Sequence, residues 1–315
     1  MKYYMAPLEG ITGYIYRKTY AKYFGGVDKY FSPFISPNQK RICRTREQKD
    51  ILPENNAGLY LVPQIMTNQA DMFIKTVKYL QQYGYQEFNL NLGCPASTVV
   101  TKMKGSGFLA QPEKLEQFLE QIYEKCDANI SIKTRIGFES AEEFSRLLSI
   151  FEKFPVNELI IHPRTRQDFY QNEPDMEAFS YAMSHSRHRI CYNGNIFSKK
   201  DYTNLVENYP ALQSVMLGRG ILQNPTIIEQ IKGNELPDKD HIKAFMTEIC
   251  EKYKEELSGD RPVLFKMKEL WQYLVFSFDV DEKWKKKMRK AQSLSEYQII
   301  INELFSKYQY IGDEK

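Results

Sequence analysis

The sequence predicts an α/β fold, a (β/α)8 TIM barrel with a C-terminal all-α helical domain, and two observations support this prediction. Along the first three quarters of the chain, runs of apolar, β-branched and aromatic residues alternate with amphipathic helical patterns, which is typical of a parallel sheet. The runs are spaced by roughly 25–30 residues, and their number, eight, closes a barrel. Beyond Gly233 the pattern is helical only, which predicts a small helical bundle.

The expected elements follow one another in a regular order. The strands lie at residues 2–6, 29–34, 59–64, 87–91, 129–135, 158–162, 189–193 and 214–218. The helices between them include residues 71–83, 112–125, 141–154 and 199–208, with Asp71 and Ser198 as expected N-caps. An open doubly wound sheet has the same alternation, but polar residues at nearly every strand end favour a barrel, in which all these ends face one mouth. The first strand carries no G-x-G-x-x-G, so a Rossmann dinucleotide site is unsupported.

A proline-containing linker, Asn234-Glu-Leu-Pro-Asp, separates two expected domains. We expect a barrel domain over residues 1–233 and a helical domain over residues 238–315. Helical patterns in the second domain occupy residues 242–257, 263–275, 281–291 and 293–308.

Composition limits the class of protein. The chain has 315 residues, is 42% hydrophobic and carries a net charge of +3, which fits a globular protein and does not by itself indicate nucleic acid. Its five cysteines include no C-x-x-C pair, which argues against a disulfide framework or a zinc site and favours a reducing compartment. No apolar run is long enough to cross a bilayer. We therefore expect a cytoplasmic protein with no metal and no membrane contact, and a monomer.

Cys94 is the first candidate for chemistry. The strand at residues 87–91 is followed by Gly93-Cys94-Pro95, and a residue before proline has little backbone freedom. An ordinary thiol, with a reference pKa of about 8.5, is mostly protonated at neutral pH and can donate a proton. The alternative is a small buried hydrophobe, the usual role of a lone cysteine. The flanking Gly and Pro and the following loop, which contains Lys102 and Lys104, favour the functional interpretation.

Other candidates lie at the remaining strand ends. In barrels the loops after strands seven and eight form the usual phosphate site, and here they contain Asn193, Gly194 and Asn195, then Gly218 and Arg219. Turn glycines are the alternative for each loop taken alone. Lys133 and His162 could stabilise negative charge on a ring cofactor, although a surface lysine and a core histidine are the alternatives. Gln64 and Asn91 offer amides that could pair with an imide edge.

Basic residues cluster despite the mild net charge. Lys283–Lys290 contains six of them around Trp284, and Lys266 and Lys268 lie near Trp271 and Tyr273. Cations of this kind hold phosphates, and aromatic faces hold unstacked bases. A solvated helix face is the alternative.

These segments carry a family resemblance. Ala6-Pro-Leu-Glu-Gly-Ile-Thr12, Asn89-Leu-Asn-Leu-Gly-Cys-Pro95, Lys133-Thr-Arg-Ile-Gly137, His162-Pro-Arg-Thr-Arg-Gln167, Asn193-Gly-Asn-Ile196 and Gly218-Arg-Gly220 with Asn224-Pro225 follow, in order, the pattern of the tRNA-dihydrouridine synthases. The resemblance covers about the first 230 residues, and the tail resembles the family's RNA-binding domain in size and kind. Asn195 stands where many members carry Asp and Pro163 where many carry Gly, while Lys266-Met-Lys-Glu269 replaces an Arg-x-Lys-His-like segment.

The resemblance implies an enzyme that uses flavin mononucleotide (FMN), reduced by NADPH or NADH, to convert uridines of tRNA to 5,6-dihydrouridine. Hydride would reach C6 from reduced FMN, and Cys94 would give a proton to C5. FMN would contact Pro7, Leu8, Glu9, Gln64, Lys133, His162, Asn193, Gly194, Asn195, Gly218 and Arg219. For tRNA we expect contacts from Asn91, Lys102, Lys104, Arg164, Arg166, Lys266, Lys268, Lys286 and Arg289.

Two other functions remain open from the sequence. An FMN-dependent barrel oxidoreductase acting on a free pyrimidine or another small molecule would explain the barrel and the cysteine loop, but not the basic tail. A non-catalytic RNA-binding protein would explain the basic tail and would contain no flavin.

Overall fold

The computed structural model describes residues 1–312 and contains two compact units. The first unit comprises Met1–Pro7, Asp28–Asn195 and Pro210–Met216. The second comprises Leu8–Val27, Ile196–Tyr209 and the chain from Leu217 onward.

The first unit contains a parallel sheet with the order β3-β2-β1-β9-β8-β7-β6-β5-β4. Its segments are β1 (Lys2–Met5), β2 (Lys29–Phe31), β3 (Leu61–Val62), β4 (Gln64–Ile65), β5 (Glu87–Leu92), β6 (Asn129–Gly137), β7 (Leu159–Thr165), β8 (Ile190–Tyr192) and β9 (Ser214–Leu217). β3 and β4 are consecutive in the chain, separated only by Pro63, which has no N–H to donate to a ladder. The two ends of the strand order are therefore halves of one strand, and the sheet closes into an eight-stranded barrel.

Strand β5 shows how the barrel is filled. Its residues alternate between apolar and polar, a pattern that predicts one packed face and one solvated face, yet every residue in it is buried. The polar residues pair with polar residues of neighbouring strands, Asn89 with Ser131 and Asn91 with Lys133. The polar face of this strand therefore lines a closed interior, because neighbouring strands cover it.

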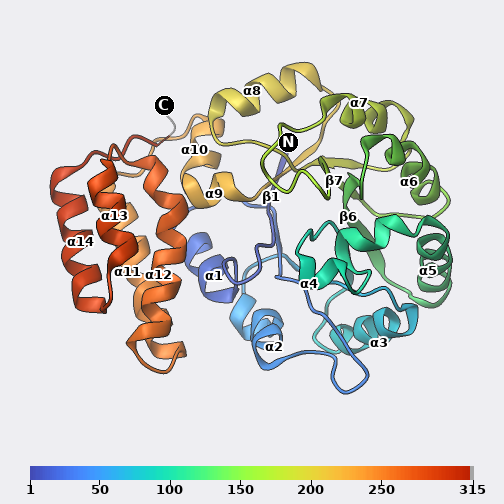
Figure 1. Ribbon diagram of the computed structural model, residues 1–315, viewed down its shortest axis with the longest axis horizontal. Coiled ribbons are helices and arrows are strands. Elements are labelled where there is room, and N and C mark those ends of the chain that lie inside the picture. The colour runs from blue at the N-terminus through green and yellow to red at the C-terminus, as the bar shows by residue number, and fades with distance from the viewer. Residues whose placement is uncertain (313–315) are drawn as a thin grey trace. The chain divides into compact units, whose positions relative to one another are not determined.

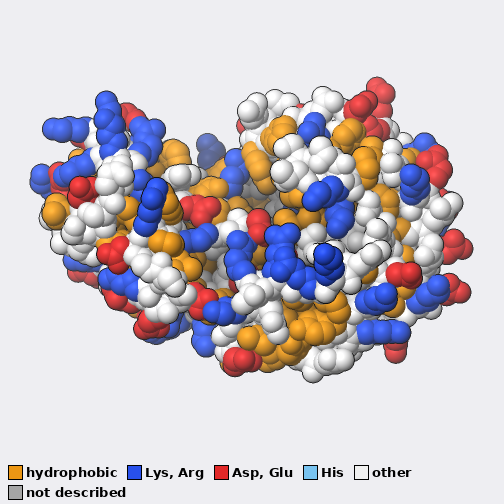
Figure 2. All heavy atoms as spheres, turned by 60° about the horizontal axis from the view of Figure 1, so that its bottom comes forward, with side chains coloured by type: hydrophobic (Ala, Val, Ile, Leu, Met, Phe, Trp, Pro, Cys, Tyr) orange, Lys and Arg blue, Asp and Glu red, His pale blue; other side chains and the backbone are white. Residues whose placement is uncertain are grey.

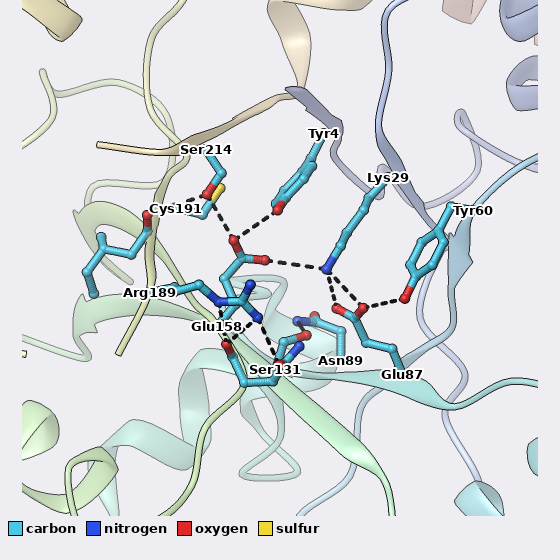
Figure 3. Close-up of polar contacts among 12 residues, drawn as sticks. Tyr4, Lys29, Tyr60, Glu87, Asn89, Ser131, Glu158, Arg189, Cys191 and Ser214 are labelled. Atoms are coloured by element: carbon cyan, nitrogen blue, oxygen red, sulfur yellow. Dashed lines mark hydrogen bonds and ion pairs between the residues drawn. The ribbon is translucent and has the colours of Figure 1, made fainter. Parts of the chain in front are cut away.

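An ion cluster lies at the amino ends of these strands (Figure 3). The Lys29 ammonium lies 2.7 Å from Glu87 Oε1 and 3.8 Å from Glu158 Oε2. Three hydroxyl groups donate hydrogen bonds to the two carboxylates, each over 2.9 Å, those of Tyr4, Tyr60 and Ser214. Burial and the Glu87 charge raise the pKa of the Tyr60 phenol to about 12, so it stays a donor at neutral pH.

Helices of the first unit surround its strands, as the cyan and green ribbons of Figure 1 show. They are α2 (Thr45–Ile51), α3 (Ala70–Gln81), α4 (Ser97–Val100), α5 (Pro112–Lys125), α6 (Phe144–Phe151) and α7 (Met176–His185), with 3-10 turns η1 (Pro53–Asn56), η2 (Gly105–Ala110) and η3 (Ala141–Glu143). In α5 the residues Leu115, Phe118, Leu119 and Ile122 form a buried face at helical spacing. Burial of each such side chain contributes about 1.5–3 kcal/mol to the free energy of unfolding.

The second unit is helical. It contains α1 (Tyr14–Tyr23), α8 (Lys199–Asn208), α9 (Arg219–Gln223), α10 (Ile227–Lys232), α11 (Lys239–Glu256), α12 (Asp260–Leu274), η4 (Val275–Ser277), α13 (Glu282–Lys290) and α14 (Leu294–Lys307). Helices α11–α14 lie side by side (Figure 1). Their core includes two tryptophans: Trp271 Nε1 donates to the Tyr297 hydroxyl over 3.0 Å, and Trp284 Nε1 donates to the Ile300 carbonyl over 3.2 Å.

The expected secondary structure is confirmed, with one local correction. Strands occupy all eight expected runs, and α8 has the expected bounds of 199–208. Ser198 caps α8, because its side chain accepts from Asp201 N–H. The expected N-cap Asp71 is wrong: Gln69 holds that position, and Asp71 lies in the first turn of α3, where a negative charge interacts favourably with the helix dipole. Within residues 1–312, no helix is both long and apolar enough to span a membrane.

Candidate active site

Cys94 lies at the carboxyl end of β5, in a turn that the following loop holds from one side. The Cys94 carbonyl accepts hydrogen bonds from Ser106, from its N–H over 3.1 Å and from its hydroxyl over 2.9 Å. Gly105 has a φ of +54°, and a Cβ there would lie 2.8 Å from the Cys94 carbonyl oxygen. Only glycine permits both this backbone conformation and this approach. The Cys94 side chain is partly exposed and forms no disulfide.

Asn91 holds the same turn from the strand. Its Oδ1 accepts from the backbone N–H groups of Gly93 and Cys94, each over 3.0 Å. A carboxamide oxygen has two lone pairs, so both are committed to the turn. The Asn-x-x-Cys spacing was a readable signal for this role, because asparagine side chains commonly bond backbone groups two residues on.

Arg135 is a residue of this site to which the sequence analysis assigned no role. It is buried in β6, and its Nε donates to the Gly93 carbonyl over 2.9 Å. Its Nη1 and Nη2 donate to the carbonyls of Thr165 and Phe169 over 2.7 and 2.9 Å. One guanidinium therefore joins the cysteine turn to the loop after β7. The sequence indicated that Arg135 lies at a strand end, but it did not indicate where its side chain points.

Lys133 pairs in register with Asn91 on the adjacent strand. Among residues 1–312, no hydrogen bond or ion pair from its ammonium is found within bonding distance. Burial, together with the Arg135 charge, lowers the pKa of Lys133 to about 8. A half-buried cation of this kind fits an anionic ligand, because an opposite charge would relieve its desolvation.

The buried side chains of His162 and Arg164 form one hydrogen-bonded group with the partly exposed Asn195. Arg164 donates from Nη1 to His162 Nε2 over 2.9 Å, and from Nη2 to Asn195 Oδ1 over 3.0 Å. Its Nε donates to the Asn172 carbonyl over 2.6 Å. The structure thus places Arg164 in the interior, with its guanidinium directed at internal acceptors. Asn195 also donates to Glu173 over 3.1 Å, which an aspartate at this position could not do.

The two glycine-containing loops belong to different units. In the first, Asn193 Nδ2 donates to the Met216 carbonyl over 2.8 Å, and a Cβ on Gly194 would lie 2.1 Å from the Tyr192 hydroxyl. In the second, Gly218 precedes α9, and the Arg219 guanidinium lies 5.3 Å from the centre of the Phe197 ring.

The first-strand residues also divide between the units. Pro7 ends a segment of the first unit, and Leu8 and Glu9 begin a segment of the second. Leu8 N–H donates to the Thr12 hydroxyl over 2.8 Å, and Glu9 is exposed.

Basic side chains of the helical bundle fall into two groups. Lys286 and Arg289 are exposed on α13, and Figure 2 shows Lys and Arg side chains crowded over the bundle at the left of the view. Lys266 donates to the Gly10 carbonyl and pairs with Glu269, while Lys268 donates to the Ala291 carbonyl over 3.0 Å. The second pair therefore has internal partners.

The aromatic residues of the bundle are placed differently from the expectation. Trp271 and Trp284 are buried core residues, so neither presents a face to a base. Phe265 and Phe276 are 55% and 50% exposed instead. A cation lies near each ring, Arg261 at 5.6 Å and Lys285 at 5.7 Å from the centres.

Near the cysteine turn, Lys102 is exposed and Lys104 is partly exposed. Burial and the charges of Lys102 and Arg44 lower the pKa of Lys104. Arg166 packs over Phe138 and Phe169, at 5.6 and 5.5 Å from the ring centres.

The closed sheet defines a (β/α)8 barrel, a class of fold in which enzymes carry their active sites at the carboxyl ends of the strands. Comparison with solved structures agrees on the fold. A 2-naphthoyl-CoA reductase complex matches with a TM-score of 0.56 at 10% identity, covering 74% of this chain and 50% of that one. Morphinone reductase in complex with tetrahydroNAD matches with a TM-score of 0.52 at 12% identity, covering 76% and 89%.

Sequence comparison identifies the family. The family described as dihydrouridine synthase (Dus) matches residues 4–309. The tRNA-dihydrouridine synthase B of Pasteurella multocida (strain Pm70) is 27% identical over 240 residues, covering 76% of this chain and 70% of that protein. A probable tRNA-dihydrouridine synthase of Staphylococcus aureus (strain COL) is 28% identical over 236 residues, covering 72% and 70%. The chain belongs to the dihydrouridine synthase family.

Proposed function

We propose that this protein is an FMN-dependent tRNA-dihydrouridine synthase that acts in the cytoplasm with NADPH or NADH as reductant. The observation that supports this most is the arrangement around Asn91, which accepts a hydrogen bond from Cys94 N–H in the turn at the end of β5 and pairs in register with Lys133 on the neighbouring strand. A proton donor and an uncompensated cation at one barrel rim suit the reduction of a polarised double bond.

The residues present fit FMN. The Lys133 ammonium has no acceptor within the described chain, and a reduced flavin ring carries negative charge that such a cation stabilises. We propose that Lys133, His162, Asn193, Gly194 and Asn195 hold the cofactor together with Pro7, Leu8, Glu9, Gly218 and Arg219. Gln64, which has no exposed surface, would support this site from behind through its hydrogen bond with Asn91. When bound, FMN supplies the hydride for C6 of uracil.

The chain's own residues account for the remaining steps. Cys94 holds a proton on Sγ and delivers it to C5 of the base, while Ser106 and Arg135 fix the carbonyls of its turn. With both lone pairs of Asn91 Oδ1 occupied, only the second N–H of its Nδ2 is left for the substrate. That donor matches a carbonyl oxygen of uracil, whereas the amino group of cytosine would meet no acceptor there.

For tRNA we propose phosphate contacts from the exposed cations Lys102, Lys286 and Arg289 and from the partly exposed cations Lys104 and Arg166. We propose no direct phosphate contact for Lys266 and Lys268, because their ammonium groups bond to carbonyls within the protein. Their role would be to shape the surface. We assign Arg164 to the cofactor side, as the partner of His162.

The test combines an absorbance scan with a tRNA assay. The purified protein is expected to be yellow and, with NADPH or NADH, to form dihydrouridine in tRNA that lacks it, measured by nucleoside mass spectrometry. Cys94→Ala should keep the flavin and its reduction by nicotinamide but lose most dihydrouridine formation, while Cys126→Ala serves as the matched control. Reduction of free uracil or another pyrimidine without activity on tRNA would support a small-molecule oxidoreductase instead, and a colourless protein that binds tRNA would support a non-catalytic role.

A further inference from the structure

A chain of side-chain hydrogen bonds begins in the middle of the barrel. The Ser131 hydroxyl donates to the Phe88 carbonyl over 3.3 Å, and Asn89 Nδ2 donates to Ser131 Oγ over 2.9 Å (Asn89 and Ser131 are drawn in Figure 3). Gln64 Nε2 then donates to Asn89 Oδ1 over 2.8 Å. Asn89 therefore uses both ends of its carboxamide inside the barrel.

The chain continues to the cysteine turn. Asn91 Nδ2 donates to Gln64 Oε1 over 2.7 Å, and Asn91 Oδ1 accepts from Gly93 and Cys94 N–H. Three carboxamides thus connect Ser131 to the backbone that carries the thiol.

The backbone groups at the two ends set the direction of every link. The Phe88 carbonyl can only accept, and the N–H groups of Gly93 and Cys94 can only donate. If one carboxamide turned over, it would place oxygen against oxygen or nitrogen against nitrogen at both of its links. Gln64 and Asn89 have no exposed surface, so water cannot replace a lost partner, and an unmatched buried group is costly.

We propose that Asn89 is a positioning residue for Cys94, acting through Gln64 and Asn91. Within the described residues, the Asn89 side chain forms its hydrogen bonds with Gln64 and Ser131 and not with the thiol or its turn. Its carboxamide holds Gln64 in the orientation that Asn91 needs to accept from both N–H groups of the turn. The conclusion that this positioning serves catalysis rests on the proposed function. The conclusion that Asn89 restrains the Cys94 turn does not depend on it.

The test is the rate of alkylation of Cys94 by iodoacetamide, followed by peptide mass spectrometry in the full-length protein. Asn89→Leu removes the carboxamide with little change in volume. Losing one buried hydrogen bond changes an equilibrium by about three- to tenfold, so the loosened turn should raise the Cys94 rate by about that factor. Cys43 and Cys126, which are also partly exposed, report general loosening in the same sample and should not change.

Two comparisons make the test specific. Asn56→Leu removes a similarly buried carboxamide, which donates to the Asp50 and Leu52 carbonyls, and should leave the Cys94 rate unchanged. In a Gln64→Leu background the chain is already cut, so Asn89→Leu should add less than about twofold, because the two effects are then no longer additive. If Asn89→Leu does not fold, Ser131→Ala removes the acceptor of Asn89 and should raise the Cys94 rate in the same direction.

A Cys94 rate that stays within about twofold of wild type in a folded variant would overturn the proposal, as would equal acceleration of all three cysteines. Failure of the wild-type protein to form dihydrouridine would refute the proposed function and leave this alkylation test unaffected.

Discussion

Arg164 Nη1 donates a hydrogen bond to His162 Nε2 over 2.9 Å, with both side chains buried. A guanidinium has no acceptor, so Nε2 of the histidine must be unprotonated. The imidazole is therefore neutral, with its proton on Nδ1. A protonated, cationic His162 would repel the Arg164 guanidinium. The pair therefore keeps the imidazole neutral, with its Nδ1–H as a donor of fixed direction at the end of β7.

Replacing Arg164 with lysine should disrupt this pair. A lysine cannot reach three acceptors in the fixed geometry of a guanidinium, so Arg164→Lys should lower the free energy of unfolding by about 1–3 kcal/mol and reduce the flavin content. Urea denaturation and absorbance per protein measure the two effects. The control is Arg146→Lys, an exposed arginine paired with Glu113. If Arg164→Lys behaves like that control, Arg164 does not position His162.

Lys133 should lower the free energy of unfolding of the flavin-free protein at neutral pH. Its pKa is about 8 in the folded state and about 10.4 in an unfolded chain. Between these values the unfolded state binds more protons, so the lysine's contribution to the free energy of unfolding rises as pH rises from about 8 to 10.4.

Lys133→Met should therefore stabilise the flavin-free protein by about 2–3 kcal/mol at pH 7, and the gain should shrink toward pH 10. The same variant should bind flavin more weakly. Urea midpoints across this pH range, with Lys125→Met as an exposed control, measure the first effect. A gain that does not vary with pH would mean that the ammonium is not the cause.

The ion cluster at the amino ends of the strands depends on its single lysine. Removing Lys29 leaves Glu87 and Glu158 buried without a cation, so Lys29→Met should lower the free energy of unfolding by about 3–5 kcal/mol. Lys153→Met, which breaks the exposed pair with Glu116, should cost less than about 1 kcal/mol. Equal effects of the two substitutions in urea denaturation would contradict the structural role of the cluster.

Phe265 and Phe276 should contribute to tRNA binding under the proposed function. They lie about three helical turns apart, each with a cation near its ring, and stacking of a base on an aromatic face is worth about 1–3 kcal/mol. Either substitution to alanine should weaken tRNA binding by a corresponding amount without changing the melting temperature. Ile299→Ala, at a residue that is 63% exposed on α14, is the control. Unchanged affinity in both phenylalanine variants would remove these residues from the tRNA surface.

The sequence by itself determined the order and type of the elements and the family. Alternation of strand and helix patterns located all eight strands, because side-chain periodicity is a local property. The Gly93-Cys94-Pro95 turn was also visible, since Gly and Pro act on the backbone where they stand.

Only the tertiary structure decided where the side chains of those elements point. Arg164 and the tryptophans Trp271 and Trp284 carry the residue types of a nucleic-acid surface, yet all three are buried. Asn89 and Gln64 are 25 residues apart in the chain and meet because β4 pairs in parallel with β5, where the two residues are in register. The reason is that the interior of a barrel exists only once the last strand pair has formed, and composition does not distinguish a polar residue facing that interior from one facing water.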